Sequence, residues 1–203
     1  MEGLVLPVLL FVLACLVLCI KLGALAAWQQ AWDDRRIRKL LQLDLPPSHY
    51  SVLHHVELPG DKEPLQIDHL VISVYGIFVI KKDSRSGRIS GKPGDARWQQ
   101  SGLFGTQQFA NPLFECVSQV KALRLLLGLD ASLLNFVLVF TGNVTLGNPM
   151  PVNVTRLDGL SLFIEGKDKL LIDFDVLPIL VGRIRAAQPL AGLDRNSVQP
   201  ASR

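Results

Sequence analysis

Three charged residues lie at the two ends of one apolar run. Their types and spacing are those of a site that cleaves phosphodiester bonds. The run covers residues 65–82 and is interrupted at residues 75–76, where a turn is expected. Asp68 lies near its start, and Lys81 and Asp83 lie two residues apart at its end. Because residues i and i+2 of a strand point to the same face, a hairpin would bring the three side chains to one edge of a sheet. Carboxylates that hold a metal ion, with a lysine beside them, form the group set of metal-dependent phosphodiester cleavage.

The elements around this hairpin predict a mixed α/β domain. Apolar residues recur at helical spacing in residues 31–43 and again in 111–128, where Asn-Pro opens the segment and Gly closes it. Residues 50–58 and 135–141 have the length and composition of strands. The remaining expected elements are a strand at 88–90, a Gln- and Gly-rich loop at 99–110, a strand at 152–155, a strand or helix at 160–164 and a helix at 175–187. This order indicates one central sheet with helices packed on it.

An uncharged apolar run near the amino end predicts a membrane anchor. No charged residue occurs in residues 3–20, and about 20 apolar residues cross the hydrocarbon of a bilayer. Four basic residues follow within 35–39, which places the bulk of the chain in the cytoplasm by the positive-inside rule. We therefore expect a single-pass membrane protein with an anchor at 1–28, a folded domain at 29–187 and a disordered tail at 188–203.

A cleaved signal peptide is the alternative for the same run. Residues 24–26, Ala-Leu-Ala, resemble a small-residue cleavage site. A signal peptide, however, begins with a basic segment, and only Met1 and Glu2 precede the apolar residues. The three cysteines offer neither a disulfide framework nor a metal-ligand spacing, which agrees with a reducing compartment.

Two other sets of residues could bind ligands. Four basic residues that follow the hairpin could contact the phosphates of a nucleic acid, and scattered solvated charge is the other interpretation. They are Arg85, Arg88, Lys92 and Arg97. The histidines do not predict a metal site, because His54 and His55 would point to opposite faces of a strand.

An ordered set of short motifs resembles the nuclease-related domain (NERD) family over about residues 34–125. The motifs are Gln66-Ile-Asp-His-Leu-Val71, Tyr75-Gly-Ile-Phe-Val-Ile80, Ser86-Gly87, Trp98 and Asn111-Pro-Leu113. The resemblance implies a restriction-endonuclease-like α/β core with a central mixed sheet flanked by helices. It also implies a site in which an Asp on one strand and a Glu-x-Lys on the next surround Mg²⁺ or Mn²⁺.

The chemical positions of this chain depart from the family pattern. Asp68 matches the family aspartate, but Lys81 stands at the Glu position and Asp83 at the Lys position. For the acidic residue that the family often carries on its first helix, the chain offers Asp34. Two further positions of possible support are Glu115, where the family tends to have Gln, and Gln119, where His is common.

These departures leave two functional hypotheses open. The first is a pseudoenzyme: a membrane-anchored nuclease fold that binds nucleic acid, DNA rather than RNA, or a protein partner. The alternative is an active nuclease in which Asp68 and Asp83 bind Mg²⁺ or Mn²⁺ and Lys81 faces the phosphate. We expect no tightly bound cofactor in either case. The exchange of Lys81 and Asp83 favours the first hypothesis, because an ammonium at a ligand position repels a cation.

Overall fold

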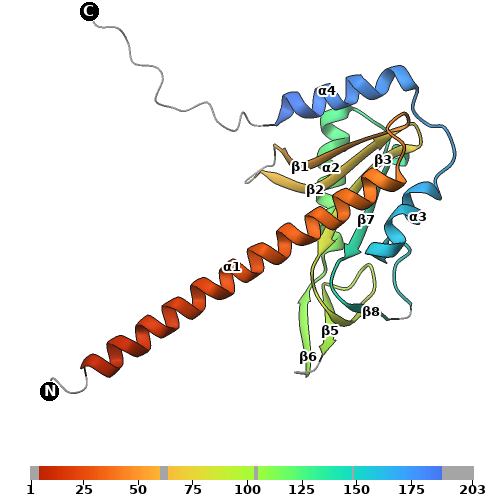
Figure 1. Cartoon of the computed structure of the whole chain (residues 1–203). Helices are drawn as coiled ribbons and strands as arrows, with labels where there is room; N and C mark the ends of the chain where they lie inside the picture. Colours follow the sequence, from red (N-terminus) through yellow and green to blue (C-terminus); the bar gives the residue numbers. More distant parts are fainter. Residues whose placement is uncertain (1–4, 60–63, 103–104, 148, 189–203) are drawn as a thin grey trace, which may run out of the picture. The chain divides into compact units, whose positions relative to one another are not determined.

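The chain divides into two units, residues 1–43 and 44–203, in the computed structural model (Figure 1). The structure describes residues 5–59, 64–102, 105–147 and 149–188. The first unit is formed by helix α1, Val5–Asp44, whose last residue belongs to the second unit. The helix predicted at 31–43 is the carboxyl-terminal part of α1. In this part Ile37 and Leu41 are buried, whereas Trp32 is half exposed and stacks on Trp28 with ring centroids 5.8 Å apart.

Most side chains of the predicted anchor and almost all of the predicted tail lie outside the described residues. Residues 1–4 of the predicted anchor are not described, and neither are most side chains of residues 5–26. Among the residues that are described, we find no helix with the length and apolar character needed to cross a membrane. The predicted tail at 188–203 lies outside the described residues except for Gln188.

A five-stranded mixed sheet forms the centre of the second unit. Its order is β1 (Tyr50–Leu58), β2 (Leu65–Ser73), β3 (Gly76–Asp83), β7 (Leu134–Phe140) and β9 (Val154–Arg156). The first three strands are antiparallel, whereas β3, β7 and β9 run parallel. The predicted hairpin is confirmed: Ser73 pairs with Gly76, whose φ of 130° favours glycine.

A smaller four-stranded sheet was not expected. Its order is β6 (Gly105–Ala110), β5 (Arg97–Gly102), β4 (Gly87–Ser90) and β8 (Val144–Leu146). The prediction of a loop at 99–110 is therefore wrong, because β5 and β6 form a hairpin there. Of these two strands only Trp98 and Phe109 join the core, so their sequence lacks the apolar alternation by which strands are recognised.

Helices cover both faces of the large sheet. They are α2 (Leu113–Leu127), α3 (Leu160–Glu165) and α4 (Leu177–Ala187), with short 3₁₀ turns η2 (Ala131–Leu133), η3 (Leu157–Gly159) and η4 (Phe174–Val176). Helix α2 begins after Asn111-Pro112 and ends at Gly128, whose φ is 67°, as predicted. The ambiguous segment 160–164 is helical.

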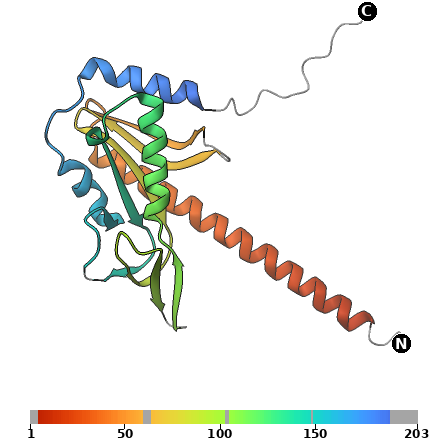
Figure 2. The same ribbon diagram turned by 180° about the vertical axis from the view of Figure 1, so that it is seen from behind.

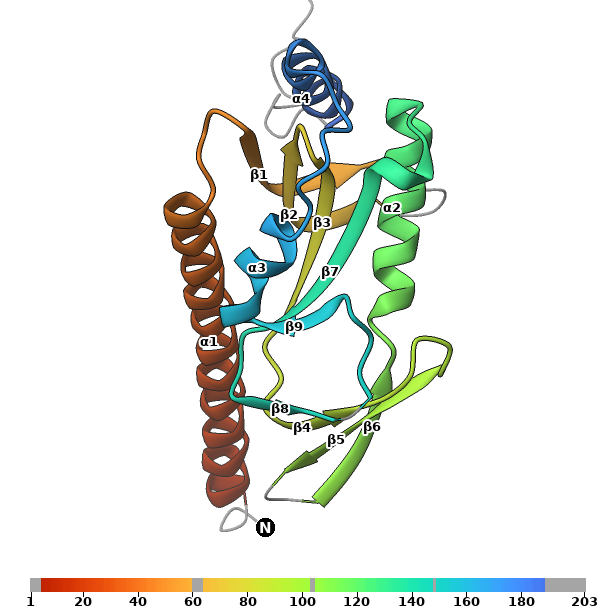
Figure 3. The same ribbon diagram turned by 90° about the vertical axis from the view of Figure 1, so that its right-hand side faces the viewer.

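Two parts of the core, among the described residues, meet at Phe136 on β7. Helices α2 and α4 pack on one face of β1, β2 and β3, as Figure 2 shows. Figure 3 shows α3 on the opposite side, where Phe163 contacts Phe78 edge-on. The second part joins the small sheet to the large one through Trp98, Phe109 and Phe140. Most residues of β2 and β3 are thus buried on both faces, which agrees with their Val, Ile and Phe content.

Candidate functional site

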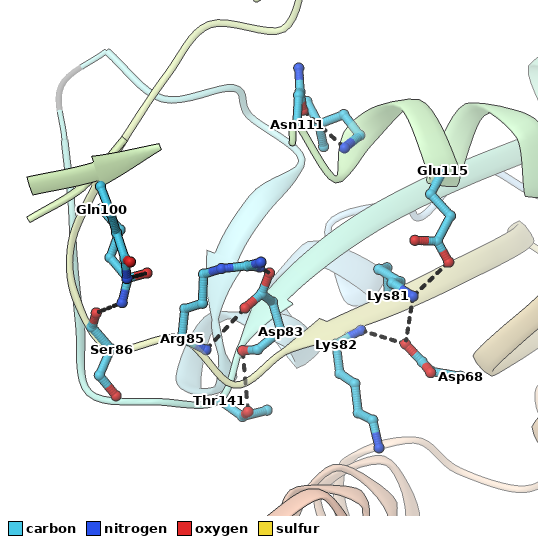
Figure 4. A network of polar contacts seen from close by, with 12 residues as sticks. Asp68, Lys81, Lys82, Asp83, Arg85, Ser86, Gln100, Asn111, Glu115 and Thr141 are labelled. Atoms are coloured by element: carbon cyan, nitrogen blue, oxygen red, sulfur yellow. Dashed lines mark hydrogen bonds and ion pairs between the residues drawn. The ribbon is translucent and has the colours of Figure 1, made fainter. Parts of the chain in front are cut away.

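The ammonium group of Lys81 lies between two carboxylates, beside the start of β2 and the end of β3. Lys81 Nζ is 2.6 Å from Glu115 Oε1 and 3.8 Å from Asp68 Oδ2 (Figure 4). The three residues come from β3, from the first turn of α2 and from β2. The side chain of Lys81 points to the same face of β3 as those of Ile77 and Val79, because alternate residues of a strand share a face. Ile77 and Val79 pack in the core beneath α2, so the Lys81 side chain also points toward this helix.

Asp68 has a structural role besides this ion pair. The β2–β3 ladder ends at the pair His69–Ile80. One residue further along, the Asp68 carboxylate accepts a hydrogen bond from the backbone N–H of Lys82 at 2.9 Å. Asp68 therefore replaces the missing ladder bond and holds the end of β3 beside β2.

Gln119 supports the cluster from one turn further along α2. Its Nε2 donates to the backbone oxygen of Gln66 at 2.6 Å and to Glu115 Oε1 at 3.2 Å. The side chain is buried, and within the described part of the chain its Oε1 has no hydrogen-bond partner. Two residues predicted as support, Glu115 and Gln119, are thus brought to Asp68 and Lys81.

The electrostatics keep Lys81 charged. Burial lowers the pKa of its ammonium, but the hydrogen bond to Glu115 and the charges of Asp68 and Glu115 outweigh burial, so the pKa lies above its usual value. Neighbouring Cys116 is fully buried, and burial with the nearby Glu115 charge raises the pKa of its thiol to about 12. The thiol is therefore an apolar packing group and not a nucleophile.

Asp83 is turned toward a different partner. Its carboxylate accepts hydrogen bonds from the backbone N–H of Arg85 at 2.9 Å and from the Arg85 guanidinium. Figure 4 shows Asp83 directed at Arg85 and Asp68 directed at Lys81. Burial raises the pKa of the Asp83 carboxyl, and the Arg85 contacts oppose that rise.

The four basic residues predicted for nucleic-acid binding do not form one group. Arg85 pairs with Asp83, and its guanidinium lies 4.1 Å from the ring centre of Phe109, a core residue of the small sheet. Arg88 and Arg97 are exposed on β4 and β5, and Lys92 is exposed in the turn between those strands. Arg85 therefore lies at the inner face of the small sheet, whereas the side chains of the other three residues are exposed to solvent.

The donor set does not fit a divalent metal ion as it stands. Of the two predicted metal ligands, Asp68 is paired with Lys81 and Asp83 with Arg85. Within the described ranges, no three His, Cys, Asp or Glu side chains converge as a ligand group. Asp34 belongs to α1 in the first unit, and its supporting role stays a prediction.

Comparison with known proteins identifies the family. The family model described as "Nuclease-related domain" matches residues 29–141, more than half of the chain. The chain belongs to the NERD family. This family is part of the restriction-endonuclease-like superfamily, so the recognition from motifs is confirmed. The match includes Asp68, Lys81, Asp83 and Glu115, and it extends beyond the predicted range of 34–125.

One curated relative of this NERD protein is an uncharacterised protein of Bacillus anthracis. It is 31% identical over 101 residues, which cover 49% of this chain and 47% of the relative. The chain thus spans about half the length of the curated relative that it matches. No solved structure matches the chain.

Sequence reasoning missed the role of Asn111 in this NERD domain. Its amide Nδ2 donates to the carbonyls of Pro93 and Asp95 at 3.0 and 2.8 Å, and its Oδ1 accepts from the N–H of Leu113 at 3.0 Å. The Asn-Pro motif signalled the helix start. Nothing local indicated that the same side chain holds a loop about 18 residues earlier in the chain.

Proposed function

We propose that this NERD protein is a membrane-anchored, catalytically degenerate nuclease fold that binds nucleic acid without cleaving it. The observation that carries the proposal is the position of Lys81. Its ammonium lies within ion-pair distance of both Asp68 and Glu115, so these carboxylates already have a cation. Cleavage in this superfamily, in contrast, implies carboxylates that are available to hold a metal ion.

The energetic argument rests on like-charge repulsion. A divalent cation and an ammonium about 4 Å apart repel by about 8 kcal/mol at an effective dielectric constant of about 20. Because its pKa is raised, Lys81 does not relieve this repulsion by losing its proton at neutral pH. Metal binding would therefore require the Lys81 side chain to leave Glu115 and Asp68.

The alternative, an active Mg²⁺-dependent nuclease, is favoured by one observation. Asp68, Lys81 and Glu115 lie together in one cluster, so two carboxylates and one ammonium are present within a few ångströms. A substrate phosphate that attracted Lys81 would leave the two carboxylates for a metal ion. Cleavage would then depend on Asp68.

A titration with Mn²⁺ and a plasmid assay separate the two hypotheses. We expect the full-length protein, in a mild detergent, to bind plasmid and single-stranded DNA and to nick neither in the presence of Mg²⁺ or Mn²⁺. In the titration, the electron paramagnetic resonance signal of free Mn²⁺ should stay unchanged when the protein is added. Replacing Lys81 with Gln removes the ammonium, so the Lys81→Gln variant should bind Mn²⁺, whereas Lys121→Gln on the exposed side of α2 should not.

The hypothesis of a degenerate nuclease would be contradicted if the unaltered protein nicked DNA with a metal ion and this nicking required Asp68. Asp68→Asn is the sharper test than Asp68→Ala, because the amide oxygen can still accept the Lys82 N–H bond. Asp168→Asn, at an exposed loop position, is the matched control. Nicking that persists in Asp68→Asn would point to a contaminating nuclease.

Membrane anchoring is supported by the uncharged residues 3–20, by the basic residues within 35–39 and by the continuous helical backbone of α1. We expect the protein to stay with membranes after alkaline carbonate extraction and its domain to be accessible to protease from the cytoplasmic side. Release of a protein shortened after residues 24–26 would instead establish the signal peptide.

A further inference from the structure

Among the described strand residues, the side chains on the outer face of the small sheet are mainly polar or basic, and none is acidic. Ile89, Trp98 and Phe109 pack into the core, so their strand neighbours point the other way. The cross-strand pairs place these outward residues side by side. They are Arg88 and Ser90 on β4, Arg97, Gln99 and Ser101 on β5, and Thr106, Gln108 and Ala110 on β6.

A surface pocket lies at one end of this face. Its volume is about 300 Å³, and it is lined by Ser90, Gly91, Lys92, Asp95, Arg97, Gln99 and Pro149. Lys92 and Arg97, two of the residues expected to bind phosphate, therefore share one pocket with a hydroxyl and an amide group. Asp95 offsets one positive charge, but its Oδ2 accepts the backbone N–H of Lys92 at 2.8 Å and so closes the turn.

The turn that carries Lys92 is held from behind by buried side chains. Trp98 Nε1 donates to the Lys92 carbonyl at 2.9 Å, and Asn111 Nδ2 donates to the carbonyls of Pro93 and Asp95. In a trans peptide the C=O and the following N–H point in opposite directions. The N–H groups of Gly94 and Ala96 are therefore directed away from Asn111, and the hydrogen bonds from Trp98 and Asn111 hold the backbone of this turn in place.

Close packing also fixes the turn on the side of Gly91. A Cβ added to Gly91 would lie 2.2 Å from the Trp98 ring, whereas one added to Gly94 would meet nothing within 4 Å. The backbone at residue 91 thus lies directly on the buried indole. A pocket with a backbone held in this way needs little reorganisation on binding.

We propose that this pocket, with the adjoining outer face of β4 and β5, binds the phosphodiester backbone of a nucleic-acid strand. The inference rests on the proposed nucleic-acid-binding function and gives it a location away from Asp68 and Lys81. Lys92 and Arg97 contact phosphate, and Arg88 continues the same face. Ser90 and Gln99 donate hydrogen bonds without selecting a base sequence. The outward residues include no large apolar side chain, which favours nucleic acid over a lipid surface.

The test is fluorescence anisotropy with the full-length protein in mild nonionic detergent and a labelled single strand or duplex of DNA. We expect the double variant Lys92→Gln/Arg97→Gln to bind DNA about tenfold more weakly. The slope of the logarithm of the binding constant against the logarithm of the salt concentration should fall by the amount that about two phosphate contacts contribute. The control Lys121→Gln/Arg124→Gln makes the same charge change on the exposed side of α2 and should bind like the unaltered protein. Both variants should melt at the unaltered temperature.

Each other outcome overturns a defined part of the proposal. If the unaltered protein binds DNA and the Lys92/Arg97 variant binds equally well, the pocket inference is wrong and the proposed function stands. If the unaltered protein binds no DNA, both fail. If it binds vesicles that contain phosphatidylserine but no DNA, and the double variant loses that binding, the pocket takes lipid headgroups instead.

Discussion

Replacing Trp98 with alanine is expected to lower the free energy of unfolding by about 3–5 kcal/mol. The indole is fully buried, and its ring lies edge-on to Phe109 at 6.3 Å between centroids. It also supplies the hydrogen bond to the Lys92 carbonyl. Its loss would open a cavity between the two sheets and release the turn. Urea unfolding followed by far-ultraviolet circular dichroism measures the change.

Trp98→Phe separates packing from the hydrogen bond. It retains most of the buried ring but cannot donate to Lys92, so we expect a loss of about 1–2 kcal/mol. Trp32→Ala is the exposed control, because half of that side chain faces solvent. Equal unfolding midpoints for the unaltered protein and Trp98→Ala would show that the small sheet contributes nothing to the stability of the fold.

Replacing Asn111 with alanine should cost about 2–4 kcal/mol of stability. The side chain is buried and makes hydrogen bonds in both directions, to the carbonyls of Pro93 and Asp95 and from the N–H of Leu113. Alanine leaves these backbone groups, including the Leu113 N–H at the start of α2, without their side-chain partner, and each such loss costs about 1 kcal/mol or more. Thermal unfolding measures the effect.

The control for Asn111 is Asn143→Ala at an exposed position, which should change stability by less than about 0.5 kcal/mol. Because Asn111 holds the turn that carries Lys92, the Asn111→Ala variant should also bind DNA more weakly at temperatures where it is folded. Unchanged stability in Asn111→Ala would mean that the turn is held by Trp98 alone.

The parts of the fold that were predicted depend on local signals. The turn at Gly76 follows from one glycine between two β-branched runs, and the bounds of α2 follow from Asn111-Pro112 and Gly128. Strand β7 was recognised from the length and apolar composition of its run, most of which is buried in the structure. These features need only the nearest residues along the chain, so a pattern of types and spacings predicts them.

The small sheet could not be predicted in the same way. Strands β5 and β6 consist mainly of Gln, Ser, Thr and Gly, which resemble a loop by composition. Their pairing depends on Trp98 and Phe109 reaching a core that β7 and α2 complete. Pairing with residues far along the chain therefore overrode local propensity.

The amino-acid sequence alone determined the family, the α/β class, the hairpin and the identity of the candidate site residues, because each of these follows from residue type and local order. Only the tertiary structure decided that Lys81 lies against Glu115, 34 residues away, that Asp83 turns to Arg85, and that Lys92 and Arg97 share a pocket. Such contacts depend on strand register and on the rotational phase of a helix packed against the sheet. Those are set by the burial of the whole core, and no single segment contains them.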